Sequence, residues 1–156
     1  MSAFSDFLSD PQHFGIWLVE MTGYKLADGS TAVFRYSTAE YATEPTDSPA
    51  NALYSARVVK GFNLSADTIP PATVGILPRV QGGVVKLAQR FGDLDSTFED
   101  YAFEGRAITI KYGGRSRFGR LAYADFGVVF VGTVAKVKPG LAEVEITLRD
   151  AQSKMD

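Results

Sequence analysis

Apolar and polar residues alternate along several stretches of the chain. In the segment 143–149 every even position is apolar and every odd position is polar. Successive side chains of a strand point to opposite faces, so this pattern predicts a strand with one buried face and one wet face. The same alternation predicts strands over 106–112 and 84–91.

The segment 127–134 differs because it is apolar at nearly every position. Such a run is typical of a central strand buried on both faces. Gly132 within this run predicts a β-bulge. The turn residues Lys138-Pro139-Gly140 then predict a hairpin that leads into the strand over 143–149.

The first half of the chain is also expected to be rich in strands. Asp28-Gly29 predicts a turn between strands at 16–21 and 31–36. Further strands are expected at 54–60 and 73–77. Eight or nine short strands with turns between them predict a mainly β fold, namely an antiparallel β-sandwich or barrel with one or two short helices.

Helix is expected only over 2–8 and 96–103. The apolar residues of the first segment share one side of a helix: Phe4, Phe7 and Leu8. In the second segment Ser96 is the expected N-cap, and Glu99 completes a capping box. Gly105 is expected to end this helix.

The chain has 156 residues, of which 46% are hydrophobic and 22% charged. This predicts one β-rich domain over 1–156, with the short helix at 2–8 and a strand-rich body over 14–150. Sixteen basic and 18 acidic residues give a net charge of −2, which argues against nucleic-acid binding. The absence of cysteine excludes disulfides, thiolate nucleophiles and zinc–thiolate sites.

No signal-peptide pattern opens the sequence, and no run reaches the length of about 18 apolar residues that a membrane span needs. We therefore expect a protein that stays in the compartment where it is made and has no membrane partner.

The glycine-rich segment 114–121 comes close to two catalytic motifs and completes neither. A phosphate-binding P-loop needs Lys and then Ser or Thr after its last glycine, and here the pair is Arg120-Leu121. A nucleophile elbow needs glycine two residues after the serine, where Phe118 stands. The segment is better interpreted as a glycine-rich β-turn with solvated arginines.

Other catalytic and metal sites are also incomplete. His13 is the only histidine, and no nucleophile or orienting group stands beside it. Five residues have the spacing of a calcium-binding loop: Asp93, Asp95, Thr97, Glu99 and Glu104. However, Phe98 occupies the sixth position, where the turn of such a loop requires glycine. We therefore expect no catalytic residues, no cofactor and no metal.

Charged residues in the second half of the chain form two blocks. The acidic block contains five acids and no base: Asp93, Asp95, Glu99, Asp100 and Glu104. The basic block contains five bases and no acid: Arg106, Lys111, Arg115, Arg117 and Arg120. The blocks are either solvated faces that pair within one molecule, or patches that join copies head to tail and so close rings. The second interpretation gives a candidate interface: Asp93, Asp95, Glu99, Arg115, Arg117 and Arg120.

Several short motifs follow one another between residues 80 and 156. Phe91-Gly92-Asp93-Leu94-Asp95 precedes Gly105-Arg106-Ala107-Ile108-Thr109-Ile110. Val129-Phe130-Val131-Gly132-Thr133-Val134 comes next, and Ile146-Thr147-Leu148-Arg149-Asp150 closes the series. This succession resembles a β-rich, adaptor-like domain of tail and baseplate proteins from tailed bacteriophages and prophages.

The resemblance implies a non-enzymatic structural component of a phage tail or baseplate, or of a tail-like particle. The resemblance leaves open whether it is a ring component, a fibre adaptor or a tail-completion protein. Together with the charged blocks, it leads us to expect a ring-like oligomer that contacts other tail, baseplate or fibre proteins. It would assemble in the host bacterial cytoplasm and end in the tail of the virion. The family shares no catalytic residues, so none is transferred to this chain.

Two alternatives remain open from the residues alone. The first is a carbohydrate-binding β-sandwich module in which exposed tyrosines stack on sugars: Tyr24, Tyr36, Tyr41 or Tyr54. The second is a small hydrolase that depends on Asp93 or Asp95.

Overall fold

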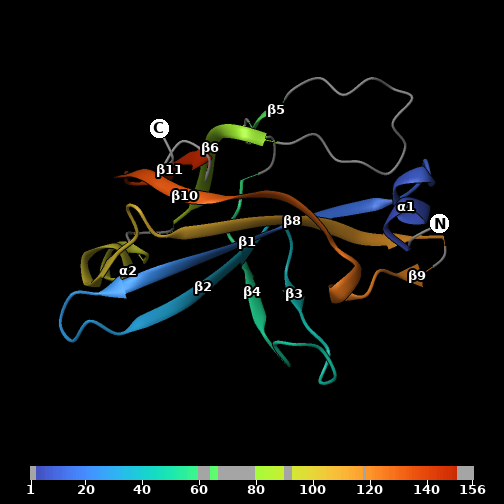
Figure 1. Cartoon of the computed structure of the whole chain (residues 1–156), viewed down its shortest axis with the longest axis horizontal. Helices are drawn as coiled ribbons and strands as arrows, with labels where there is room; N and C mark the ends of the chain where they lie inside the picture. Colours follow the sequence, from blue (N-terminus) through green and yellow to red (C-terminus); the bar gives the residue numbers. More distant parts are fainter. Residues whose placement is uncertain (1–2, 60–63, 67–79, 90–92, 118, 151–156) are drawn as a thin grey trace.

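The computed structural model describes residues 3–59, 64–66, 80–89, 93–117 and 119–150, which form a mainly β fold (Figure 1). Its helical elements are short: α1 (Ala3–Ser9), α2 (Asp95–Asp100) and the 3-10 helix η1 (Tyr123–Asp125). The strands are β1 (Phe14–Lys25), β2 (Thr31–Ser37), β3 (Tyr41–Ala42), β4 (Leu53–Ala56), β5 (Leu64–Ala66), β6 (Val80–Ala88), β7 (Tyr101–Ala102), β8 (Ala107–Ser116), β9 (Gly119–Arg120), β10 (Gly127–Pro139) and β11 (Glu143–Asp150). The predicted fold class is confirmed. Within the described ranges, no helix is long and apolar enough to cross a membrane.

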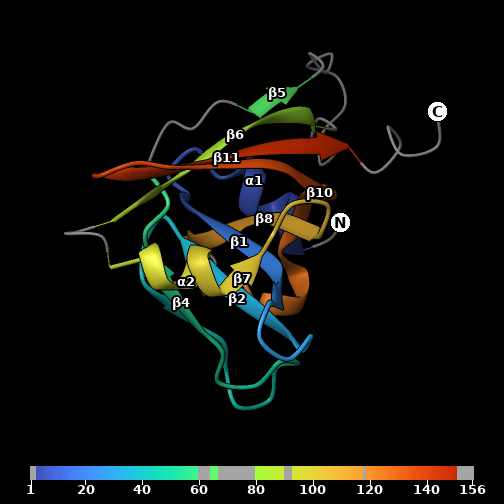
Figure 2. The same cartoon turned by 90° about the vertical axis from the view of Figure 1, so that its left-hand side faces the viewer.

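The strands pair in the order β3-β4-β2-β1-β8-β10-β11-β6-β5, and the contact between β2 and β4 is parallel. The residues after β4 close this sheet on itself. Val58 donates its N–H to the Ser37 carbonyl of β2 at 2.9 Å, and Val59 donates to the Lys86 carbonyl of β6 at 3.0 Å. Val58 also forms a bridge with Leu87. The sheet therefore curls into a barrel, with β6, β11 and β10 on one side of the core and β1 and β2 on the other (Figure 2).

Side-chain alternation fills the inside of this barrel. In β11 the even positions Val144, Ile146 and Leu148 are buried, and Glu145 faces outward, as the alternation predicts. The other long strands add inward-facing pairs: Val19 and Met21 from β1, Val85 and Leu87 from β6, Ile108 and Ile110 from β8, and Phe130 and Val134 from β10. Each fully buried aliphatic side chain contributes about 1.5–3 kcal/mol relative to exposure, so this core is the main stabilising element.

A second apolar layer lies outside the barrel wall. Leu18 of β1 points away from the barrel core and is still fully buried, because it clusters with Phe7 of α1 and with Tyr41, Tyr54 and Phe126. The predicted apolar side of the first helix packs into this layer: Phe4, Phe7 and Leu8. The short helix α1 is therefore held by tertiary packing rather than by its own propensity.

The structure corrects the interpretation of the central strand. β10 is a central strand, as predicted, and it lies between β8 and β11. However, Val128 and Val131 are 52% and 57% exposed, so only one face is buried. The bulges also lie elsewhere than at Gly132: the register shifts between Val128 and Phe130, and again after Val134. Gly132 instead allows β11 to approach β10 closely, since a methyl group at Gly132 would overlap the Arg149 carbonyl oxygen.

The second predicted helix is shorter than expected. α2 ends at Asp100, and its N-cap is Leu94 without a side-chain hydrogen bond, so the capping box of Ser96 and Glu99 is wrong. The chain extends from Tyr101 because β7 pairs with β1 there.

Strand β4 is shorter than predicted, ending at Ala56. The strand predicted at 73–77 and the end of the one predicted at 84–91 lie outside the described residues.

Candidate interaction surfaces

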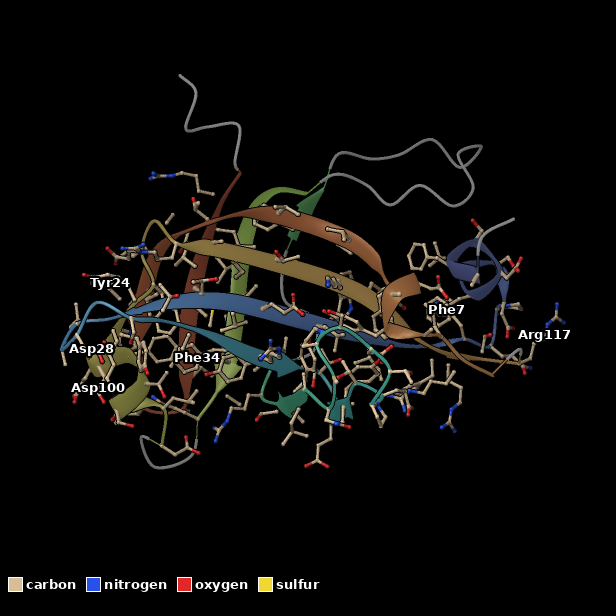
Figure 3. The ribbon with its side chains drawn as sticks, turned by 60° about the horizontal axis from the view of Figure 1, so that its bottom comes forward. Phe7, Tyr24, Asp28, Phe34, Asp100 and Arg117 are labelled. Carbon is tan, nitrogen blue, oxygen red and sulfur yellow. The ribbon has the colours of Figure 1, made fainter. Side chains whose placement is uncertain are left out.

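The predicted interface residues lie at the two ends of the long axis of the barrel. α2, which carries Asp95 and Glu99, is at one end together with Asp28 and Asp100 (Figures 1 and 3). Arg117, in the turn between β8 and β9, is at the other end. β1 runs from one end to the other, and its 12 residues span roughly 35 Å. At about 0.15 M salt, interactions between exposed charges are largely screened beyond about 8 Å, so the charges of the two ends do not pair within one molecule.

The turn between β1 and β2 is a fixed projection at the α2 end. Leu26 is 62% exposed, and its N–H donates to the Asp100 carbonyl at 3.0 Å, which ties the turn to α2. The Ser30 hydroxyl and the Ser30 N–H both donate to Asp28, and these hydrogen bonds lower the pKa of the Asp28 carboxyl. Gly29 has a φ of 76°, which the turn requires. An exposed leucine is thus held beside carboxylates.

Cations also lie at this end of the barrel. Lys25 is 4.0 Å from the Asp28 carboxylate, and the guanidinium of Arg106 lies 4.6 Å from the centre of the Tyr24 ring. Asp93 forms an ion pair with Arg57 at 2.7 Å. The basic block of the sequence is therefore divided by the fold, because Arg106 lies over Tyr24, at the same end as Asp28 and Asp100 (Figure 3). Asp93, predicted to contact another copy, has a partner within its own chain.

Lys111, another member of the basic block, belongs to a polar cluster on the barrel wall. The hydroxyls of Tyr54 and Tyr123 both donate to the Glu20 carboxylate, the second at 2.6 Å. Lys111 donates to the Tyr123 hydroxyl at 2.8 Å and lies 3.7 Å from Glu20. Burial first, and then the bond to Glu20, raise the pKa of Tyr54, so its phenol remains a proton donor. These hydrogen bonds hold Tyr54 of β4 and Tyr123 of η1 against the barrel.

The arginines of the opposite end lie on the hairpin of β8 and β9. Arg115 pairs with Arg120 and Ser116 with Gly119, which confirms the predicted glycine-rich β-turn. Arg115 and Arg117 are exposed. Gly114, in the same hairpin, has a φ of 149°. The fold therefore gathers three arginines of the basic block at one place.

The guanidinium of Arg120 is bound within the fold. Its guanidinium lies 3.2 Å from the Glu44 carboxylate, donates to the Ala42 carbonyl at 2.6 Å and stacks 4.7 Å from the centre of the Tyr41 ring. These contacts hold the hairpin against β3. Arg115 and Arg117, exposed on the same hairpin, are the arginines that we test below for contact with another molecule.

Asp10 fixes the position of the arginine-bearing turn. Its carboxylate accepts the N–H of Arg117 at 2.7 Å and the N–H of Gln12 at 3.0 Å. The bond from Arg117, followed by the bond from Gln12, lowers the pKa of the Asp10 carboxyl. Ionised Asp10 therefore stabilises the link between the end of α1 and the turn.

This link should depend on pH. A lowered carboxyl pKa contributes stability above the unfolded value of about 4, and the contribution disappears as pH falls through the folded value. We expect the difference in melting temperature between the wild type and Asp10→Asn to be largest at neutral pH and to shrink as pH falls from about 5 to about 2. A difference that stays constant over this range would contradict the role of the charge.

A groove of about 560 Å³ opens between the arginine hairpin and β3. Its walls include Phe14 and Ile16 of β1, Tyr41 of β3, and Arg115 and Arg120 of the hairpin. Phe14 is 59% exposed, which is unusual for an aromatic side chain within a strand. The groove thus combines an apolar surface with cationic groups.

The groove exists because β2 leaves β1 early. The pairing of the two strands ends at Leu18 and Ser37, and the Trp17 carbonyl makes the last contact, accepting from Thr38 at 3.1 Å. Backbone groups of alternate residues point to the same edge of a strand, so Gly15 directs its N–H and carbonyl the same way as Trp17. Within the described ranges no strand pairs with β1 on that side before Leu18.

The other candidates from the sequence, His13 and the calcium-like series, have structural contacts or secondary structure that account for them. His13 contacts the Asp10 carbonyl at 2.6 Å and the Tyr112 hydroxyl at 3.2 Å, and its ring packs on Phe7. The residues of the calcium-like spacing include α2 instead of a ligand loop. Across the described part of the chain, no three His, Asp or Glu side chains converge as a metal site requires.

The tyrosines proposed for sugar stacking do not form an exposed platform. Tyr36, Tyr41 and Tyr54 are buried, and Arg106 lies over the ring of Tyr24. The three buried rings belong to the two apolar layers, in which burial of large aromatic surface stabilises the fold. The burial of Tyr36, Tyr41 and Tyr54 contradicts stacking of sugars on these three residues.

Neither a protein-family model nor a curated protein sequence matches this chain. Among solved structures, the fold is similar to that of a chain in the virion of a native gene transfer agent (GTA) particle, with a TM-score of 0.53 and 13% identity. The alignment covers 99% of this chain and 46% of that chain, so this chain spans less than half the length of its structural neighbour. It therefore shares its fold with part of a protein chain of that virion.

Proposed function

We propose that this protein is a non-enzymatic structural component of a phage tail or baseplate, or of a tail-like particle. In this role it contacts further copies of itself and connects tail or fibre proteins. The observation that carries the proposal is the fold likeness to a chain of a virion particle, which extends over 99% of this chain. The succession of short motifs between residues 80 and 156 supports the same role.

The use of the polar groups also supports a structural role. Glu20, Tyr54, Tyr123 and Lys111 bind one another and hold outer elements to the barrel. His13 is engaged by backbone and ring contacts. These groups are of types that often act in catalysis, and here each has a partner that accounts for its position.

The proposal is tested by the location of the protein in particles. Particles purified from the producing cells should contain this protein in a fixed number of copies relative to the major tail protein, measured by quantitative mass spectrometry. Antibodies against it should label the tail region in electron micrographs. A protein that is abundant in the lysate and missing from the particles would contradict the proposed function.

Contact between copies should depend on the charges of the two ends. Reversing Arg115 and Arg117 to Glu should reduce the amount of protein retained in particles by about tenfold, the effect of losing about 1.4 kcal/mol of contact free energy. A melting curve of the variant checks that it stays folded, because Arg117 adjoins the Asp10 carboxylate. Raising the salt concentration should weaken wild-type assembly through screening.

Two matched variants distinguish this contact from a general effect of charge. Reversing the exposed Lys136 and Lys138 of β10 to Glu makes the same change of charge elsewhere and should leave retention unchanged. Adding Asp95→Lys and Glu99→Lys to the arginine reversal should partly restore retention, because complementarity depends on opposite sign. If the arginine variant assembles normally, the contact between copies lies on another surface.

A further inference from the structure

We infer that the groove beside β1 is the seat for the β1–β2 turn of a second copy, with Leu26 of that copy in contact with Phe14 and Ile16. This inference rests on the proposed function, in which copies meet end to end. It adds the segment that is inserted and the surface that receives it, neither of which follows from the charged blocks.

The projecting partner in this contact is rigid. The N–H of Leu26 is bound to the Asp100 carbonyl, and the N–H of Gly29 donates to the Lys25 carbonyl at 2.9 Å. Ser30 is bound to Asp28 by two hydrogen bonds. A leucine that is 62% exposed on an already ordered turn loses little conformational entropy when it is buried in a partner.

The receiving partner has suitable size and chemistry. A volume of about 560 Å³ lies within the range of protein sites that enclose a compact ligand. Phe14 and Ile16 supply apolar contact. At Gly15, beyond the end of the pairing with β2, the edge of β1 can offer backbone hydrogen bonds to an incoming turn.

The charges of the two surfaces are complementary. Leu26 lies near Lys25 and Asp28, and its N–H is bound to the carbonyl of Asp100, a second acid. The groove is lined by one anion and by cations, Glu40 with Arg115 and Arg120. Glu40 can therefore face Lys25 while Arg115 faces Asp28. Arg120 already binds Glu44, so it contributes shape more than new charge pairing.

The two surfaces lie at opposite ends of the barrel, so one molecule cannot fill its own groove (Figure 3). Contact between unlike surfaces is heterologous, and it generates a ring if the rotation between copies closes and a filament if it does not. Each copy thus has one projecting turn, between β1 and β2, and one groove that can receive the turn of another copy.

The absence of cysteine from the chain permits a direct test. A Leu26→Cys protein is mixed with an Ala42→Cys protein, because Ala42 is exposed and lines the groove. A disulfide requires Cα atoms within about 7 Å, so it forms only if the turn of one copy reaches the groove of another. Under mild oxidation we expect a disulfide-linked pair, identified by mass spectrometry of the linked peptides.

Leu141→Cys provides the matched control. Leu141 lies in another hairpin turn and is 96% exposed, so random collision would link a cysteine at this position at least as fast as one in place of Leu26. The pair of positions 26 and 42 should link at least about tenfold faster than the pair 141 and 42, because docking raises the effective concentration. Equal rates, with melting curves that show folded variants, would overturn the inference.

The outcomes also separate this inference from the proposed function. Loss of assembly in the arginine variants without selective linking of 26 and 42 would mean that copies meet end to end through a different seat, which overturns the inference alone. Selective linking of 26 and 42 in a protein that is missing from particles would uphold the seat and contradict the role in the virion. A link from position 42 to a different particle protein would assign the groove to that partner and overturn the inference.

Discussion

Replacing Ile146 with alanine should lower the free energy of unfolding by about 2–5 kcal/mol. Ile146 is fully buried and pairs with Val85 of β6 on one side and Val137 of β10 on the other. The substitution removes buried methyl and methylene groups and leaves a cavity that the closed barrel cannot collapse to fill. Total stabilities are about 5–15 kcal/mol, so this loss is large, and urea unfolding monitored by circular dichroism measures it.

Glu145→Ala is the matched control on the same strand. Glu145 faces outward and is 3.9 Å from Lys86, an exposed ion pair that contributes little. Its replacement should change the free energy of unfolding by less than about 0.5 kcal/mol. Comparable losses at positions 145 and 146 would mean that the register of β11 is wrong.

Gly114→Ala should destabilise the protein by about 2–5 kcal/mol. An added methyl group would overlap the Phe14 carbonyl oxygen, and Gly114 has a φ of 149°, which side chains disfavour. The backbone has little room to move, because Gly114 pairs with Gly15 and its carbonyl accepts the N–H of Leu121 at 2.8 Å. Thermal unfolding would measure the loss.

Gly119→Ala separates the conformational cost from the clash. Gly119 has a φ of 106°, and nothing in the described part of the chain lies within 4 Å of the position a methyl group would take. Alanine there should cost only about 1–2 kcal/mol, from the backbone conformation alone. If Gly114→Ala were no more harmful than Gly119→Ala, the close approach of β1 and β8 at Phe14 would be refuted.

The strands could be predicted from the sequence where one face meets the core and the other meets water. β11 satisfies this condition, and its inward residues Val144, Ile146 and Leu148 were identified by period alone. β10 does not satisfy it, since Val128 and Val131 are apolar and exposed. A run of apolar residues carries no information about which face is covered, because that depends on neighbouring strands and on bulges.

The surfaces that we propose for assembly were only partly visible in the sequence. The charged blocks pointed to Arg115 and Arg117, but sequence proximity also grouped Arg106 and Lys111 with them, and the fold carries these to other places. The groove had no local signal, because it forms where β2 departs from β1 and a distant hairpin approaches. Leu26 was visible only as an apolar residue before a turn of Asp and Gly.

β1 connects the two proposed contact surfaces directly. Phe14 at its first position lines the groove, and Lys25 at its last position leads into the projecting turn. A tensile load passed from copy to copy would therefore travel along a single strand. The covalent backbone of β1 would then carry the load, and the hydrogen bonds from β1 to β2 and β8 would keep that strand extended. A row of such subunits would therefore be stiff under tension.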